Sequence, residues 1–159
     1  MSYIYYLKMS IENAMNKILC SVTVVTTKYE NKLNGASIAW ITKLSKSPLL
    51  IMFAMAKGRY TFELIQKSKV FAVNILSTEQ IDVGKHFGLI SGRKADKFEG
   101  IKYDTLKTGS PILKNCAAVL DCKLYSYFEA GDHYIVVGEV VDGISTNKEP
   151  LVYNRDDFY

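Results

Sequence analysis

The chain is dominated by runs of β-branched and apolar residues separated by polar turns, a pattern that predicts strands more often than helices. The first run, SVTVVTT (21–27), is too dense in valine and threonine for a stable helix. It is followed by Asn34-Gly35, the dipeptide most typical of a tight hairpin, and then by ASIAWIT (36–42). We therefore expect strands over 21–27 and 36–42, joined by a turn within 29–35 in which Asn34-Gly35 is the strongest hairpin signal.

Further strands are predicted downstream. The apolar run LLIMFAMA (49–56) has the character of a central strand, and FAVNIL (71–76) predicts another. Two longer stretches, 117–128 and 133–145, are expected to pair as a hairpin. Gly131 lies between them, where glycine can adopt the backbone conformation that a turn requires.

Helices are expected to be few and short. Ser10 is placed to cap a helix over 11–19, and Thr61 to cap a helix ending near residue 68 with one apolar face. A third helix is predicted over 80–89. Because strands and helices do not alternate regularly, a doubly wound parallel sheet is disfavoured. The pattern favours a closed or nearly closed antiparallel barrel with peripheral helices, since closure removes exposed sheet edges.

The composition is that of one ordinary globular domain. Of the 159 residues, 48% are hydrophobic and 23% are charged. The net charge of +4 does not by itself indicate a nucleic-acid partner, and the absence of any run of 18 apolar residues argues against a membrane span. We expect a single domain over 1–159, with 1–9 as an irregular N-terminal extension that lacks the pattern of a signal peptide.

The cysteines indicate a reducing compartment. Cys20, Cys116 and Cys122 are odd in number, and the sequence contains no C-x-x-C pair, so neither a disulfide framework nor a zinc ribbon is expected. Buried, reduced thiols in a cytoplasmic protein are the plain interpretation. The two histidines are far apart in sequence, and no metal site is predicted.

Two basic loops are candidates for binding a phosphate group. In Lys57-Gly58-Arg59-Tyr60-Thr61, two cations precede a predicted helix, and the free N–H groups and positive dipole end of a helix favour an anion. A second basic loop, 91–97, is placed to close over the same group. The alternative is that both loops are solvated charge runs and that Thr61 is an ordinary helix cap.

A segment of small residues suggests where a planar ligand would lie. Residues 34–42 are led by glycine and contain the only tryptophan, Trp40. Small residues let a flat ligand approach the backbone, so that amide groups can meet its ring carbonyls. The alternative is that the glycine only turns a hairpin and that Trp40 only fills the core.

Two further polar residues are candidates for contact with a ligand. Asn74 lies within an apolar strand, where its amide must find partners, either the local backbone or a ligand. His133 begins the strand after the Gly131 turn, a position on a barrel rim where an imidazole is both accessible and close to a pocket. A structural role is the alternative for His133.

The order of these segments resembles the flavin reductase-like family, the FMN-binding split barrels. No one motif is specific, and the resemblance comes from the ordered series over residues 10–155. Its members are SVTVVTT, Asn34-Gly35 with the small residues after it, Ser47-Pro48-Leu49, Lys57 to Thr61, Phe71 to Leu76, Lys97-Phe98, Gly131-Asp132-His133 with Gly138-Glu139-Val140, and Pro150-Leu151-Val152-Tyr153.

The resemblance implies a mainly β fold, an antiparallel Greek-key split β-barrel with a few peripheral α-helices, and a homodimer with FMN near the subunit interface. Residues 39–42 would line the isoalloxazine ring through their backbone, and His133 would be the catalytic residue near the incoming nicotinamide. Many family members carry Asn-Ser or Asn-Thr where this chain has Ala39-Trp40. The predicted cofactor-binding residues are Ser37, Ala39, Trp40, Ile41, Thr42, Lys57, Arg59, Thr61, Asn74 and Lys97.

Three functions remain open from the sequence. The first is a flavin oxidoreductase that transfers hydride from NADH or NADPH to FMN and passes electrons to a partner monooxygenase, to iron or to a small redox protein. The second is a flavoredoxin-like FMN-binding electron carrier that never meets a nicotinamide. The third is a barrel that binds another phosphorylated small molecule without redox chemistry. None of the three requires a nucleic acid, a membrane or a metal.

Overall fold

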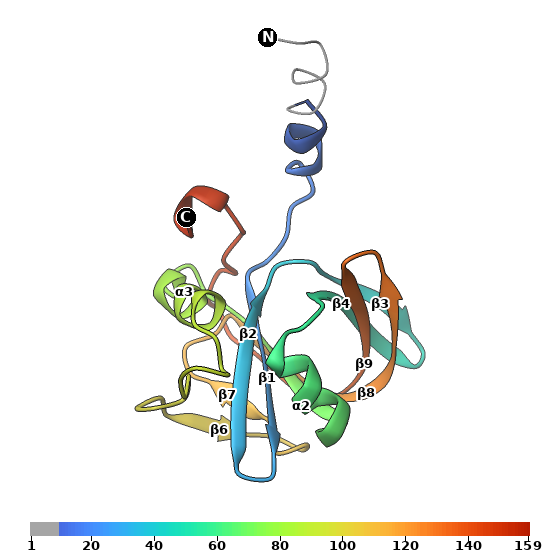
Figure 1. Ribbon diagram of the computed structural model, residues 1–159, viewed down its shortest axis with the longest axis vertical. Coiled ribbons are helices and arrows are strands. Elements are labelled where there is room, and N and C mark those ends of the chain that lie inside the picture. The colour runs from blue at the N-terminus through green and yellow to red at the C-terminus, as the bar shows by residue number, and fades with distance from the viewer. Residues whose placement is uncertain (1–9) are drawn as a thin grey trace.

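The computed structural model describes residues 10–159, and its main feature is a single seven-stranded antiparallel sheet (Figure 1). The strand order is β2-β1-β5-β8-β9-β4-β3. The bounds of these strands are β1 Thr23–Tyr29, β2 Lys32–Ile38, β3 Ile41–Lys46, β4 Leu49–Ala56, β5 Val70–Ile75, β8 Ala118–Ala130 and β9 His133–Ser145.

The sheet curls into a barrel that stays open between β2 and β3, its two edge strands. Phe53, Phe71 and Val136, from three different strands, meet in the interior and are almost completely buried. The two phenyl rings pack edge to face with centroids 5.3 Å apart, a favourable aromatic geometry. The predicted fold class, a mainly β antiparallel barrel with a few helices, is confirmed.

The first hairpin turns within the predicted stretch 29–35, but not at its Asn34-Gly35 dipeptide. The turn is at Glu30-Asn31, and Glu30 adopts a left-handed φ of 53°. Asn34 and Gly35 lie inside β2, where Gly35 pairs with Thr26. A Cβ on Gly35 would come within 3.0 Å of the Phe87 ring, so this glycine serves close packing rather than a turn. The turn therefore lies within the predicted stretch 29–35, but the expectation that Asn34-Gly35 forms it is wrong.

The stretch predicted as one strand over 36–42 is divided between two strands. β2 ends at Ile38 and β3 begins at Ile41, so that Ala39 and Trp40 form a link between the two edges of the barrel. The backbone at the link is already bonded, because the Trp40 carbonyl accepts from the Ala54 N–H at 2.9 Å and the Ile41 N–H donates to the Ala39 carbonyl at 3.1 Å. The Trp40 side chain stays 59% exposed. It does not fill the core.

Two helices pack against the sheet, α2 Tyr60–Ser68 and α3 Ile81–Leu89. α2 inserts Phe62 and Ile65 into the barrel core, and it starts one residue earlier than predicted, with Arg59 at the N-cap position and no side-chain cap. The prediction that Thr61 caps this helix is wrong. α3 agrees with the prediction over 80–89. At the N-terminus residues 10–15 are helical, whereas a helix over 11–19 was expected, and the predicted irregular extension 1–9 lies outside the described residues.

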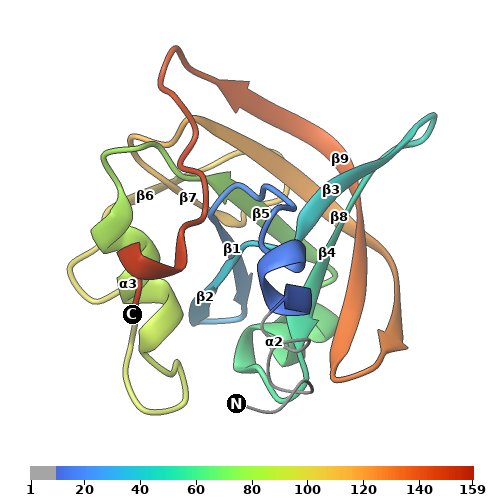
Figure 2. The same ribbon diagram turned by 90° about the horizontal axis from the view of Figure 1, so that it is seen from above.

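A second core lies on the outer side of the sheet, beneath α3. It joins Leu76, Phe87 and Phe98 to a small sheet of β6 Tyr103–Thr105 and β7 Pro111–Leu113, which was not predicted. Figure 2 shows the C-terminal tail running back over α3, where it forms the short 3-10 helix η1 Arg155–Asp157. The tail and α3 therefore lie on one side of the barrel mouth.

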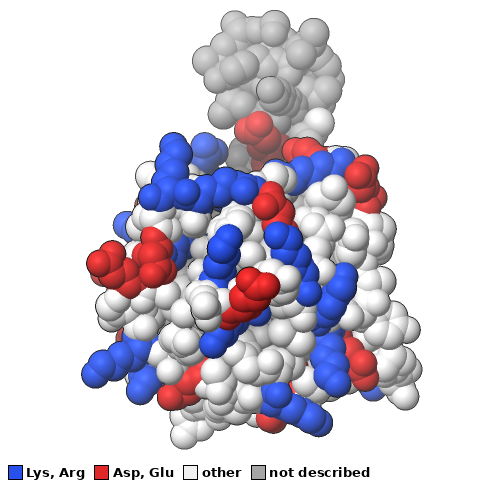
Figure 3. Space-filling view, turned by 60° about the horizontal axis from the view of Figure 1, so that its bottom comes forward, with Lys and Arg blue, Asp and Glu red and all other residues white. Residues whose placement is uncertain are grey.

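The β8–β9 hairpin was predicted correctly around Gly131, which has a φ of 60°. Two irregularities in its register, at Asp121/Cys122 and at Leu124/Ser126, bend the pair as β-bulges do. On the face in Figure 3, lysine and arginine side chains are spread widely and acidic side chains lie among them. No helix within residues 10–159 has the length and apolarity that a membrane crossing requires.

Candidate functional site

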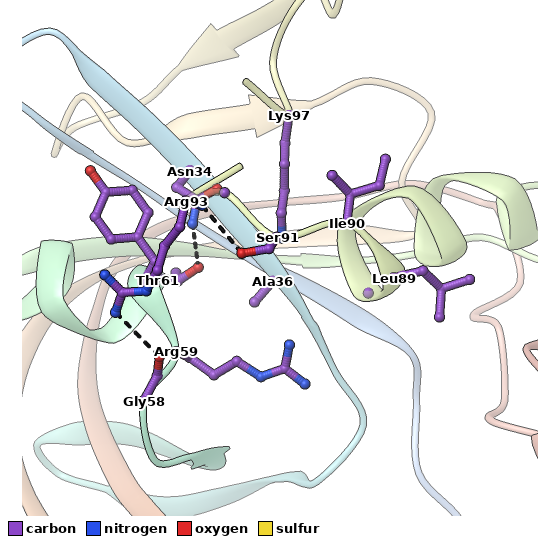
Figure 4. A pocket seen from close by; sticks show the side chains of 13 residues that line it. Asn34, Ala36, Gly58, Arg59, Thr61, Leu89, Ile90, Ser91, Arg93 and Lys97 are labelled. Carbon is purple, nitrogen blue, oxygen red and sulfur yellow. Dashed lines mark hydrogen bonds between the residues drawn. The ribbon is translucent and has the colours of Figure 1, made fainter. Parts of the chain in front are cut away.

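Two adjoining cavities lie beside the open edge of the barrel, and they share Arg59, Gly88 and Leu89. The smaller, of about 220 Å³, lies between the start of α2, the middle of β2 and the loop after α3 (Figure 4). The larger, of about 460 Å³, lies between the end of β2, the end of β4, α3 and the C-terminal tail. Together they offer the size of an ordinary ligand pocket.

The smaller cavity begins at the N-terminus of α2. Arg59 is the N-cap residue, and the first turn of the helix receives no side-chain hydrogen bond. Thr61, only 1% exposed, accepts a hydrogen bond from the Asn34 amide nitrogen at 2.9 Å, which leaves its own hydroxyl proton free to donate. Free N–H groups, a hydroxyl and an arginine thus face one space, an arrangement that favours an anion.

Lys97 brings a buried positive charge to the same cavity. Its Nζ donates to the Gly35 carbonyl at 2.8 Å and to the Phe87 carbonyl at 2.9 Å, and its third N–H remains available. Burial, together with the nearby Arg59, lowers the pKa of Lys97 to about 8. Among the described residues no carboxylate pairs with it, which is uncommon for a lysine that is 4% exposed. An anion in the cavity would relieve this cost.

Asn34 lies in the wall of the smaller cavity, packed against the loop after α3. Its side-chain oxygen is buried and has no hydrogen-bond partner among the described residues. A Cβ on Gly92 would come within 2.3 Å of that oxygen, so only glycine lets the loop lie against it. A buried, unpaired acceptor costs free energy, so the contact between this loop and β2 is held at some cost in stability.

The basic loop 91–97 does close over the smaller cavity, as the sequence suggested, but not all its charges are free. Arg93 lies across the opening and pairs with Glu63, whose pKa it lowers through the hydrogen bond. It also donates to the Gly58 carbonyl at 3.3 Å. Arg93 therefore ties the loop to α2, while Arg59 and Lys97 supply the unpaired positive charge.

The larger cavity continues from Arg59 to the barrel rim. Ser37 and Ala39 line it from β2, and the Ser37 hydroxyl donates to the Gly84 carbonyl at 2.6 Å, which joins β2 to α3. Trp40 and His133 stand together at the rim with ring centroids 4.8 Å apart and planes tilted by 32°. A cavity with small residues at its base and aromatic side chains at its edge suits a planar ligand.

His133 is oriented by its neighbour in sequence. Its Nδ1 lies 2.6 Å from an Asp132 oxygen, and this hydrogen bond lowers the pKa of the Asp132 carboxyl. The side chain of His133 is 22% exposed, and that of Asp132 is almost fully exposed. With Nδ1 engaged, Nε2 is the ring atom left to meet a ligand.

Four of the predicted cofactor-binding residues are not at the cavities. Asn74 is fully buried in the sheet, where its amide donates to the Val24 carbonyl and accepts from the Leu113 N–H, so its role is structural. Lys57 turns away to pair with Glu129 at 3.1 Å. Ile41 and Thr42 line neither cavity, and only the first half of the stretch 39–42 reaches the site. The predicted residues that do come together are Ser37, Ala39, Trp40, Arg59, Thr61, Lys97 and His133.

The sequence did not predict that α3 and the C-terminal tail line the larger cavity. Lys85 and Gly88 line the larger cavity from α3, and Tyr153 and Arg155 line it from the tail. The spacing of Gly84 and Gly88 on one face of α3 was a usable sign of close approach, because Phe158 packs on Gly84 and Ser37 on Gly88. Nothing in the sequence of the tail showed that it returns to the site.

Comparison with known proteins identifies the family. The Flavin reductase like domain matches residues 15–159. The chain belongs to this family. Flavin reductase from Pseudomonas putida is 36% identical over 122 residues, covering 77% of this chain and 69% of that protein. The reductase subunit HsaB of a flavin-dependent monooxygenase from Mycobacterium tuberculosis is 31% identical over 150 residues, covering 92% and 78%.

Solved structures confirm the split-barrel fold of this flavin reductase-like protein. Flavin reductase PheA2 superposes with a TM-score of 0.80 at 30% identity, covering 91% of this chain and 92% of that one. An FMN-binding protein from Thermus thermophilus superposes with a TM-score of 0.80 at 27% identity, covering 85% and 81%. Because the chain belongs to this family, a flavin is the ligand to compare with the two cavities.

The residues present fit FMN. The phosphate matches the smaller cavity, where Arg59, Lys97 and the open N-terminus of α2 meet without an unpaired carboxylate. The ring system matches the larger cavity, which has the small residues Ser37 and Ala39 at its base and aromatic side chains at its rim. The two cavities adjoin at Arg59, so the phosphate and the ring of one FMN would lie in neighbouring spaces.

Proposed function

We propose that this protein is a flavin reductase that binds FMN and oxidises NADH or NADPH. The proposal rests on the pair of adjoining cavities. The smaller one favours an anion, and the larger one has small residues at its base and His133 at its rim. Membership of the flavin reductase-like family supports it, as does the similarity to flavin reductase from P. putida. FMN, when bound, supplies the hydride-accepting ring that no amino-acid side chain provides.

The residues of the chain bind and orient the reactants. Arg59, Lys97 and the N–H groups of α2 neutralise the phosphate, and so fix one end of the flavin. Trp40 and His133 cover the edge of the larger cavity, where they limit the access of water. The Asp132 carboxylate holds the imidazole of His133 in one orientation, so that Nε2 faces the incoming nicotinamide.

A second candidate function is an FMN-binding electron carrier with no nicotinamide turnover. It is favoured by the stack of Trp40 on His133, because these rings occupy the rim over which a nicotinamide would have to pass. A third, a barrel that binds a non-flavin phosphate ester, is supported only by the cations of the smaller cavity.

An anaerobic assay separates these functions. Purified protein is mixed with FMN and with NADH or NADPH, and the loss of flavin absorbance is followed against a protein-free control. A reductase bleaches the flavin with at least one nucleotide. If the protein binds FMN but neither nucleotide reduces it, the carrier function stands and the reductase is refuted. If FMN does not bind, both flavin functions are refuted.

We also propose that the protein works as a cytoplasmic homodimer that delivers electrons to a partner monooxygenase or a small redox protein. The described N-terminal segment supports the dimer, since Ile11, Met15, Ile18 and Leu19 are more than half exposed, and such apolar surface is typical of an interface. Free Cys20, Cys116 and Cys122 are compatible with a reducing compartment. HsaB, named as a monooxygenase reductase subunit, is the relative that motivates the partner.

A further inference from the structure

The larger cavity carries more positive charge than a single flavin phosphate requires. Arg59 lies where the two cavities meet, whereas Lys85 on α3 and Arg155 in η1 line the larger cavity only. No aspartate or glutamate is among the described residues that line it. Within residues 10–159 the side chains of Lys85 and Arg155 take part in no ion pair. Two cations therefore remain beside the cavity after the flavin phosphate has been satisfied at Arg59 and Lys97.

The C-terminal tail supplies aromatic rings next to these cations. Tyr153 and Phe158 stack with centroids 5.6 Å apart and planes 23° apart, and Tyr159 is 83% exposed. All three residues line the larger cavity. Rings of this kind form a platform on which a nucleobase stacks.

The tail is anchored, so this platform has a fixed place. The Tyr153 N–H donates to the Cys20 carbonyl at 2.8 Å, and the Phe158 N–H donates to the Arg155 carbonyl at 3.0 Å. The Phe158 ring packs on Gly84, where a Cβ would come within 2.8 Å of it. Asp156 and Asp157 follow Arg155 in sequence, but they do not line the cavity.

We propose that Lys85 and the C-terminal tail form a subsite for the adenosine 2′-phosphate of NADPH, and that this protein uses NADPH in preference to NADH. The inference rests on the proposed reductase function. The two nucleotides differ only in that phosphate, which carries a charge of about −2 near pH 7. In Rossmann-type sites a carboxylate binds the ribose hydroxyls of NAD, whereas an arginine accommodates the 2′-phosphate of NADP, and the same charge logic applies to any site. Among the described residues, those that line this cavity include the cations and no carboxylate.

The proposed position leaves the nicotinamide end free to reach the rim. In Figure 1 the tail and α3 lie on one side of the end of β2, and β4 and β9 lie on the other. Trp40 and His133 line the cavity on the β4–β9 side, and Arg155 lines it on the tail side. Arg155 and His133 therefore lie on different sides of the cavity, which separates the proposed 2′-phosphate subsite from the rim where the nicotinamide would react.

The direct test uses nucleotide fragments, and so does not depend on turnover. Adenosine 2′,5′-bisphosphate and 5′-AMP are titrated separately into the full chain in a calorimeter. The 2′-phosphorylated probe should bind about tenfold more tightly, which is the effect of one charge-assisted contact at a partly exposed site. The double variant Lys85→Gln/Arg155→Gln should bind both probes equally. Lys102→Gln, which removes an exposed lysine away from both cavities, should keep the preference.

The outcomes separate this subsite from the proposed function. Equal affinity for the two probes, or a preference that survives the double substitution, overturns the subsite even if both NADH and NADPH reduce FMN. A preference that the double substitution removes supports the subsite, and it does so even if neither nucleotide is oxidised, in which case the reductase function alone is refuted. In an active reductase the Michaelis constant for NADPH should be about tenfold lower than that for NADH.

Discussion

At the scale of single residues, the buried ammonium of Lys97 explains most about the site. Its two bonds to the carbonyls of Gly35 and Phe87 hold it in place without neutralising its charge. Its pKa in the folded protein is about 8, against about 10.5 in the unfolded chain. Folding therefore disfavours the protonated form of Lys97. Between pH 8 and pH 10.5 the free energy of unfolding of the FMN-free protein should increase with pH, because the unfolded chain binds this proton more tightly than the folded protein does.

Phosphate binding has the opposite dependence on pH, because an anion needs the charged form of Lys97. We predict that the affinity for FMN is nearly full at about pH 7 and falls about tenfold by about pH 9. A fluorescence titration of FMN at several pH values measures this. Lys97→Met should bind FMN weakly with a flat pH profile, whereas Lys57→Met should keep the full dependence. A wild-type affinity that does not change across this range would contradict the role of Lys97.

His133 is expected to affect reduction more than binding. It touches the rim of the larger cavity and none of the phosphate contacts. His133→Ala should slow anaerobic flavin reduction by about a hundredfold, the typical cost of losing a positioning contact, and leave the FMN dissociation constant within about twofold. Stopped-flow absorbance gives the rate and calorimetry the affinity. A variant that keeps both would show that His133 is only structural.

At the scale of elements, the loop after α3 depends on its contact with β2. Gly92 lies so close to the Asn34 oxygen that a methyl group at this position must push the loop away. We predict that Gly92→Ala lowers stability by about 1–3 kcal/mol and weakens FMN binding. Thermal unfolding and a flavin titration check the two effects. Binding at wild-type strength in this variant would mean that the loop does not close the smaller cavity.

The strands could be predicted because their pattern is local. The runs 49–56 and 71–76 are almost continuously apolar, and each is a strand in the structure. The turn at Asn34-Gly35 was predicted wrongly because tertiary packing overrode a local preference. There the glycine is required by the Phe87 ring, a contact between residues 52 positions apart in sequence that no local pattern contains.

Site residues could be predicted only where a charged or polar residue also lies at a recognisable position, such as the start of a helix. Arg59 and Thr61 were found because they lie at the start of a helix, whereas Lys57, two residues earlier, points to the β8–β9 hairpin. Asn74 was a candidate because an amide in an apolar strand needs partners, and the sheet itself supplies them. The contribution of the C-terminal tail depends on how the chain returns over α3, which only the fold reveals.

At the scale of the whole molecule, the larger cavity is lined in part by the N-terminal segment, which carries exposed apolar side chains. Asn16 of this segment lines the larger cavity, so the segment and the site are close. We predict that the protein sediments as a dimer and that Ile18→Asp/Leu19→Asp shifts it toward a monomer. Analytical ultracentrifugation measures this, with Lys102→Asp as a control. A wild-type monomer at micromolar concentration would contradict the proposed dimer.

The most direct test of the whole account compares FMN with riboflavin, which has the same ring system but no phosphate. In calorimetric titrations FMN should bind about tenfold or more tightly. Arg59→Ala should remove most of that difference, while Lys57→Ala should preserve it because Lys57 pairs with Glu129 outside the cavities. Equal affinity of the wild-type protein for FMN and riboflavin, or no binding of either, would contradict the assignment of this site.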